Sequence, residues 1–327
     1  MVNRGQKIES SYLGKSVSQA AHGIMFHHFH GNGYPVVQGS ISGEQLADML
    51  EFLGGRETIL PAAEWLAKAQ AGRLQRGELC LTFDDGILGQ RDVAVPVLDA
   101  LGLTAIFFVY SSVFQGVLEP LEIFRAFRTQ HFPDIDTFYS RFFEAVSESE
   151  YESVFSVGMD GYDPATYRAE FAFYSEGDRK FRYVRDRILG PEAYSEVMVK
   201  MIKEITSLEA LSCGLWMQDS DLTGFVAAGH VIGLHSYSHP TALDEMASDV
   251  QRAEYKANID HLEGLLAFPP SVMSHPCNAY NSGTLAMLGN LGVNIGFRAN
   301  MAILGRDGLE FPREDHANIL AMMEERR

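Results

Sequence analysis

Residues 78–86 read "ELCLTFDDG", a short apolar run that ends in two adjacent aspartates and a glycine. An apolar run of this length, bounded by a turn signal, is typical of a strand that is buried on both faces. Runs of the same kind occur at 23–29, 104–110, 230–235, 271–275 and 293–298. The sequence therefore predicts a sheet of buried strands, with Asp84 and Asp85 at the end of one of them.

Amphipathic helices separate these strands. Residues 42–55, "SGEQLADMLEFLGG", begin with Ser42 and carry Gln45 three positions later, which is a capping-box signal. Residues 89–102 and 243–266 also repeat apolar side chains at helical spacing. Strands that alternate with helices predict an α/β fold whose parallel sheet is either open or closed into a barrel.

One long segment, at about 111–218, interrupts this alternation. It is rich in Phe and Tyr at helical spacing and contains no clear strand. We therefore expect a single catalytic domain over 1–327 with a helical insertion at about 111–218. The insertion either covers one end of the sheet, as long functional insertions do, or forms an outer layer of packing helices.

Composition limits the class of protein. The net charge of −17 argues against nucleic acid or an anionic membrane surface as a partner. The three cysteines are far apart and form no CxxC pair, which fits a reducing compartment. No stretch of signal-peptide length is apolar near the N-terminus, and no run of about 18 apolar residues occurs, so no membrane span is expected. The predicted location is cytoplasmic.

The predicted strand ends carry residues suited to metal chemistry. Asp84 and Asp85 end one strand, His235 ends another, and His239 follows four residues later. A dication explains the adjacent carboxylates, because it coordinates one of them and keeps the other ionised as a base. Two imidazoles and one carboxylate, with positions left for water, form a plausible catalytic Zn²⁺ site. Zinc lowers the pKa of its bound water to about 7 and so makes a nucleophile.

These residues also carry a family resemblance. "TFDDG" and the downstream "HSYSHP" resemble the first two motifs of the NodB-homology polysaccharide deacetylases, carbohydrate esterase family 4. The resemblance covers roughly 20–110 and 219–320. It implies a distorted (β/α) barrel and a divalent metal, commonly zinc. It also implies hydrolysis of an N-acetyl amide on a sugar, with Asp84 as the base and with Asp85, His235 and His239 as metal ligands.

The later motifs of this family differ here. The third motif usually reads R-x-P-Y, and its arginine orients the catalytic aspartate. The matching "SHPCNAYN" has Pro276, with His275 near the place of the arginine. Arg298 and Arg313 are the candidates to replace that arginine, unless both are ordinary surface or helix-start charges.

The general acid of the family is a histidine in an L-x-H triplet, which is absent near the C-terminus. His316 in "PREDHANIL" is the candidate, with Asp315 as a possible partner or rival. The alternative is that Glu314, Asp315 and His316 simply open the last helix.

Two further histidines, His28 and His30, share one side if the first strand continues, because alternate residues of a strand face the same way. We expect them to bind substrate together with His275 and Pro276.

The predicted function is a metal-dependent sugar N-deacetylase that acts on an acetylated saccharide. A cytoplasmic enzyme of this kind fits a soluble or lipid-linked precursor in the biosynthesis of a surface polysaccharide. Two alternatives stay open at this point. One is a hydrolase of another non-peptide C–N bond on the same fold. The other is a non-catalytic sugar-binding relative that kept the metal site.

Overall fold

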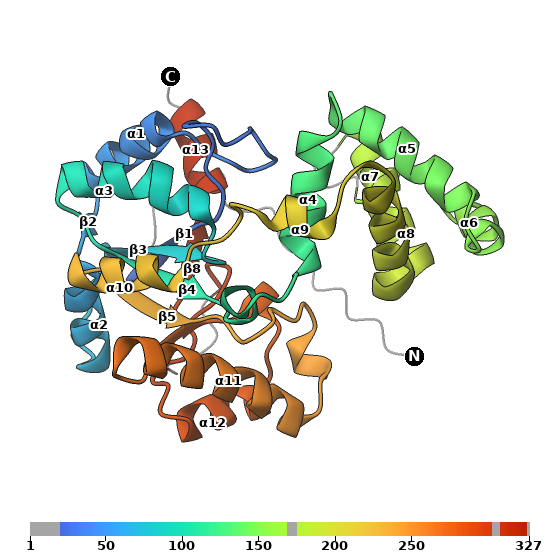
Figure 1. Cartoon of the computed structure of the whole chain (residues 1–327). Coiled ribbons are helices and arrows are strands. Elements are labelled where there is room, and N and C mark those ends of the chain that lie inside the picture. The colour runs from blue at the N-terminus through green and yellow to red at the C-terminus, as the bar shows by residue number, and fades with distance from the viewer. Residues whose placement is uncertain (1–19, 169–174, 303–307, 326–327) are drawn as a thin grey trace.

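The computed structural model describes residues 20–168, 175–302 and 308–325 (Figure 1). Its centre is an eight-stranded sheet in which the strand order is β7-β6-β5-β4-β3-β1-β8 and β2 pairs with β3. All of these strand pairings are parallel. The strands are β1 (His22–Phe26), β2 (Thr58–Ile59), β3 (Glu78–Asp84), β4 (Ala105–Val109), β5 (Val231–Leu234), β6 (Val272–Ser274), β7 (Ile295–Phe297) and β8 (Arg313–Asp315).

The sheet nearly closes into a barrel. The chain just before β8 runs beside β7, where Phe297 and Phe311 form a parallel bridge. The backbone N–H of Phe311 donates to Gly296 O, and that of Arg298 donates to Phe311 O, both at 2.8 Å. Because β8 itself pairs with β1, the two ends of the strand order meet. The predicted α/β barrel is confirmed.

Side chains of the strands alternate between the barrel interior and the surrounding helices. On β3, Leu79, Leu81 and Phe83 belong to the apolar cluster shared with the outer helices. Cys80 belongs to a different cluster, with side chains of β4, β6 and β7. Since residues two apart on a strand face the same way, Asp84 lies on the same inner side as Cys80.

Seven helices lie around the barrel among the described residues. Six of them pack on the outer apolar cluster, whereas α2 contributes Trp65 to the inner cluster that contains Cys80. The first of them has the predicted capping box, in which Ser42 and Gln45 each accept from the other's backbone N–H. The helices are α1 (Gly43–Gly54), α2 (Ala62–Gln70), α3 (Val95–Leu101), α10 (Asp219–Ala227), α11 (Ser248–Leu266), α12 (Ser282–Asn290) and α13 (His316–Glu324).

Among its described residues, the segment between β4 and α10 consists of helices joined by loops and contains none of the eight strands. Residues 169–174 lie outside the described residues. The helices are α4 (Pro120–Gln130), α5 (Ile135–Ser147), α6 (Glu152–Met159), α7 (Glu176–Tyr183), α8 (Gly190–Ile205) and α9 (Leu208–Ser212). Figure 1 shows α5 to α8 standing apart from the barrel, with α4 and α9 nearer to it. That this segment is an insertion into one catalytic domain stays a prediction.

Six of the eight strands coincide with predicted apolar runs. The other two were not predicted: β2 has only two residues, and β8 is the charged triplet Arg313–Asp315, which contains no apolar run. Among the described residues, no helix is both long and apolar enough to cross a membrane.

Candidate active site

The carboxyl edge of the barrel gathers the acidic and histidine side chains. Asp84 is the last residue of β3, and Asp85 follows it with a φ of 77°. His235 follows β5 directly, and His239 lies in the next loop with a φ of 56°. The left-handed region is unfavourable for residues other than glycine, and such strain is often found at functional sites. Parallel strands end at one edge, which is why residues 150 positions apart meet here.

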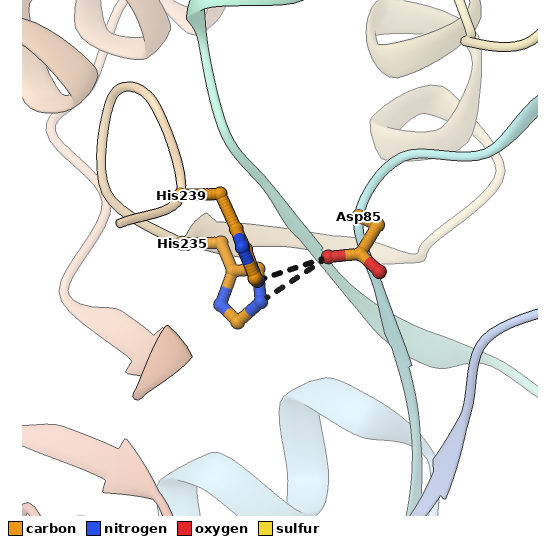
Figure 2. A group of neighbouring side chains, drawn as sticks. All are labelled: Asp85, His235 and His239. Atoms are coloured by element: carbon orange, nitrogen blue, oxygen red, sulfur yellow. Dashed lines mark ion pairs between the residues drawn. The ribbon is translucent and has the colours of Figure 1, made fainter. Parts of the chain in front are cut away.

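Asp85, His235 and His239 form a compact cluster (Figure 2). The Nε2 atoms of both histidines lie 3.4 Å from Asp85 Oδ1, and the three potential ligand atoms lie within 4.8 Å of one another. Asp85 and His235 are buried, and no described residue hydrogen bonds Asp85 Oδ1. Three donor atoms thus converge on one point and one of them has no hydrogen-bonding partner, which marks a candidate metal centre.

The donor set fits a divalent cation. Ligand atoms at about 2.0–2.1 Å from a tetrahedral ion lie about 3.4 Å apart, as the Nε2 and Oδ1 atoms do here. That separation is longer than a normal N–H···O hydrogen bond. His235 Nδ1 lies 2.9 Å from the backbone carbonyl of Ser274, which fixes the ring and leaves Nε2 for the ion. Burial raises the pKa of Asp85, but contact with His235 and His239 outweighs it and holds that pKa well below its usual range.

Asp84 is held by an arginine. Arg313 donates from Nη1 to Asp84 Oδ1 at 2.7 Å and from Nη2 to Oδ2 at 2.8 Å, a bidentate pair inside the barrel. Ser274 adds a hydrogen bond to Oδ2 at 3.2 Å. Burial raises the pKa of Asp84, but the charges of Arg313 and His235 outweigh burial and lower that pKa below its usual range. Asp84 is therefore ionised and fixed in orientation beside the metal cluster.

The second candidate arginine has other contacts. Arg298 donates from Nη2 to Asn300 Oδ1 at 3.3 Å, and its Nη1 lies 3.9 Å from Glu310. Its backbone carbonyl accepts from Arg313 Nε at 2.7 Å. Arg298 thus supports the arginine that binds Asp84, and the structure brings only Arg313 to the aspartate itself.

The structure does not bring His316 to the cluster. Its Nδ1 lies 3.2 Å from Met25 O and its Nε2 lies 2.9 Å from Gly39 O, so both ring nitrogens face backbone carbonyls. The ring is buried against Phe26, at a centroid distance of 5.7 Å. The neighbouring Asp315 caps α13 by accepting from the backbone N–H of Ala317. This geometry matches a histidine that opens the last helix and not one that donates to a substrate.

A different histidine lies beside Asp84. His27 follows β1, its Nε2 is 3.7 Å from Asp84 Oδ2, and its side chain is 31% exposed. His28 and His30, and not this residue, were expected to bind substrate. A Cβ at Gly23 would meet Arg313, so Gly23 and, by alternation, His27 lie on the inner side of the barrel, which the sequence alone does not reveal.

The four residues expected to bind substrate have separate surroundings. His28 Nε2 lies 2.8 Å from Glu122 Oε2, whereas His30 Nδ1 lies 2.9 Å from Ser40 Oγ. His275 is buried, contacts Leu309 O at 2.8 Å, and has a pKa lowered to about 3, chiefly by burial. Pro276 is buried at the start of a short turn after β6. Their part in substrate binding stays a prediction.

Comparisons with known proteins find a matching family model and solved structures of similar fold. A family model described as polysaccharide deacetylase matches residues 202–296, which include β5, both cluster histidines and β6. No curated protein sequence matches the chain. The deacetylase PplD of Streptococcus pyogenes, solved in complex with acetate, has a similar structure with a TM-score of 0.53 and 15% identity, over 93% of this chain and 98% of that one.

Two further solved structures have the same fold. A de-N-acetylase of Aggregatibacter actinomycetemcomitans matches with a TM-score of 0.51 and 10% identity, over 90% of this chain and 93% of that one. The deacetylase domain of BpsB from Bordetella bronchiseptica matches with a TM-score of 0.50 and 12% identity, over 90% of this chain and 96% of that one.

Residues 202–296 are thus similar in sequence to the polysaccharide deacetylases, and the chain shares the fold of the solved ones. The predicted resemblance is thereby confirmed, and so is the fold class. The chain departs from the expected third motif, in which an arginine precedes the proline. Here Arg313, on β8, makes the contact to Asp84 that the resemblance attributes to that motif arginine.

Proposed function

We propose that this protein is a metal-dependent hydrolase that removes an N-acetyl group from a sugar. The observation that carries the proposal is the position of the ionised Asp84. It accepts two hydrogen bonds from Arg313 and lies next to the cluster of Asp85, His235 and His239. A general base needs a fixed orientation and must be ionised to accept a proton. The contacts of Asp84 with Arg313 and its lowered pKa support both conditions. The family match supports the same reaction class.

In the proposed site, Asp85, His235 and His239 hold a divalent cation, and their two nitrogens and one oxygen favour zinc. When bound, such an ion supplies Lewis acidity and a water of lowered pKa. Asp84 takes the proton of the attacking water, whose oxygen forms a bond to the acetyl carbon. The C–N bond then breaks, and the products are acetate and a free amine.

The leaving amine requires a proton, and His27 is the histidine best situated to supply it. Its ring lies next to Asp84 and is still partly exposed, so a substrate can reach it. A positioned general acid contributes about 10²–10⁴-fold to the rate. His27→Asn should therefore lower kcat by about that factor while zinc stays bound.

The test of the reaction is product analysis. Zinc-loaded protein is incubated with oligomers of N-acetylglucosamine, and released acetate, formate and ammonia are measured separately. We expect acetate in equal amount to new free amine, loss of turnover on chelation and its return on adding zinc. Asp84→Asn should abolish turnover at unchanged zinc content. Full activity in that variant, or release of formate or ammonia instead of acetate, would refute the proposal.

We further propose that the natural substrate is a soluble or lipid-linked precursor of a surface polysaccharide. The support is the cytoplasmic location predicted from cysteine usage. A precursor enzyme should turn over short soluble or lipid-linked N-acetylated saccharides faster than insoluble chitin. A preference for the insoluble polymer would contradict this part of the proposal and leave the reaction class intact.

A further inference from the structure

The first turn of α4 carries an acidic residue that reaches the barrel from the helical segment. Glu122 Oε2 lies 2.8 Å from His28 Nε2 and 3.3 Å from Arg125 Nε. His28 belongs to the loop after β1, whereas Glu122 and Arg125 lie one turn apart on α4. The contact with His28 ties the helical segment to the carboxyl edge of the sheet, whereas the contact with Arg125 lies within α4.

Glu122 is buried, with 4% of its surface exposed, and only one of its carboxylate oxygens is satisfied. No described residue hydrogen bonds Oε1, although that atom is shielded from solvent. Burial raises the pKa of Glu122, but His28 and Arg125 outweigh burial and lower it to about 2, so the carboxylate is ionised. A buried ionised oxygen without a partner is costly and calls for an explanation.

The open oxygen belongs to a side chain close to the catalytic residues. The rings of His27 and His28 stack at a centroid distance of 6.4 Å, and His27 Nε2 is 3.7 Å from Asp84. The negative charge of Asp85 acts on Glu122 and opposes the lowering of its pKa.

The chain that leaves the helical segment also reaches this edge. Leu88 N–H donates to Leu215 O at 2.8 Å, and Met217 N–H donates to Gly86 O at 2.9 Å. The helical segment is therefore anchored on the turn that carries Asp84 and Asp85.

We propose that Glu122 is a substrate-binding residue, whose Oε1 accepts a hydrogen bond from a hydroxyl group of the sugar that presents its acetamido group to Asp84. This inference rests on the proposed deacetylase function. An ionised carboxylate only accepts hydrogen bonds, so a hydroxyl satisfies it, and charge-assisted bonds of this kind are strong. A carboxylated or phosphorylated sugar at the same position meets a buried negative charge and is rejected. The helical segment thus selects neutral saccharides.

The experiment measures binding and turnover separately. The probes are the N-acetylglucosamine tetramer and 4-nitrophenyl acetate, an acetyl compound that has no sugar hydroxyl. In the zinc-loaded Asp84→Asn background, Glu122→Gln should weaken tetramer binding by about ten- to hundredfold, measured by calorimetry. In the active background, the ratio of kcat/KM for the tetramer to kcat/KM for the ester should fall by a similar factor.

A second variant and a control guard against misfolding. Glu122→Asp keeps the charge that His28 and Arg125 require but withdraws the oxygens by one methylene, and it should show the same fall in the ratio. The matched control is Glu144→Gln, which should leave the ratio at the wild-type value. Glu144 is an exposed residue of α5 that forms an ion pair with Arg141.

The outcomes separate this inference from the proposed function. If both Glu122 variants lower kcat/KM equally for the tetramer and the ester, Glu122 has a structural role and this inference is overturned. The same conclusion follows if neither variant changes the affinity for the tetramer. If the wild-type protein neither binds nor deacetylates the tetramer or any other acetylated saccharide, the proposed function fails first and takes this inference with it.

Discussion

The barrel and the helical segment have separate apolar cores. The main barrel cluster joins β1, β3, β4 and β5 to the outer helices, whereas the cluster of the helical segment, from Ile123 to Leu211, contains no strand residue among its described members. Figure 1 shows the same division, with α5 to α8 packed on one another and away from the sheet. The residues of the proposed site lie on the barrel, and the helical segment has a core of its own that touches this site only at its edge.

Two buried carboxylates, one in each region, have different surroundings. In the barrel, both oxygens of Asp84 are bound by Arg313, and Ser274 also donates to one of them. At the contact with the helical segment, Glu122 keeps one oxygen without a described partner. Contacts on both oxygens fix the orientation of Asp84, which can still accept a proton on its remaining lone pairs, whereas an acceptor without a partner leaves a place for a ligand. In the proposed function, the barrel therefore holds the reacting groups, and Glu122 of the helical segment contributes to substrate choice.

The largest effect should follow from removing a cluster histidine. His235→Ala or His239→Ala takes away one of the three side chains proposed to bind the metal, and we expect zinc to be lost and turnover to become undetectable. Metal content by mass spectrometry and acetate release check this. The barrel should remain folded by circular dichroism. Zinc retained at unit stoichiometry in both variants would show that other residues bind the ion.

The next effect concerns the arginine inside the barrel. Arg313→Lys keeps the charge but loses the paired hydrogen bonds to Asp84, and a misplaced reacting group can cost about 10²-fold in rate. We expect kcat to fall by about that factor at unchanged zinc content. Arg298→Lys is the matched control, because Arg298 contacts Asn300 and Glu310 instead of Asp84. Equal losses in the two variants would contradict the assignment of Arg313.

The strand ends were more predictable than the contacts between them. Apolar runs bounded by turns predicted six strands, and the motifs placed Asp84, Asp85, His235 and His239 at one edge, where the structure brings them together. Sequence alone could not decide whether Arg298 or Arg313 binds Asp84, because Arg313 enters the barrel only through the pairing of β8 with β1.

The histidines of the site were harder to predict. His27 was passed over because three histidines follow β1 and the inner side of that strand depends on its neighbours. His316 follows β8 but faces two backbone carbonyls, and sequence spacing contains no information on where a ring points. Motif order predicts which residues gather at an edge, whereas side-chain direction depends on long-range packing.

A stability effect should distinguish the two cores. Phe142 is buried in the helical cluster and Phe107 is buried in the barrel, where it stacks on Phe83 at 4.8 Å. Each Phe→Ala change should lower the free energy of unfolding by about 3–5 kcal/mol. Phe107→Ala should also weaken zinc binding, because β4 separates β3 from β5, whereas Phe142→Ala should not. Thermal unfolding and zinc titration measure both, and equal losses of zinc affinity would show that the regions are coupled.

The smallest effect on turnover is expected at His316, where the structure departs most from the sequence-based expectation. Both ring nitrogens of His316 lie against carbonyls, of Met25 and Gly39, and the ring packs on Phe26. His316→Ala leaves those acceptors without their partner, which costs about 1–3 kcal/mol of stability. Because no ring nitrogen is directed at Asp84, kcat should stay within about threefold of the wild type.

His27→Ala is the variant to compare with it, since its ring lies beside Asp84 in the barrel. Single-turnover acetate release at a temperature where both variants are folded separates rate from stability. A loss of about 10²-fold or more in His316→Ala, with little change in His27→Ala, would return the role of general acid to His316 and require the start of α13 to move toward the barrel edge. The opposite result assigns the proton to His27 in the loop after β1, where the next residue, His28, contacts Glu122, so the general acid would then lie beside the contact between the barrel and the helical segment.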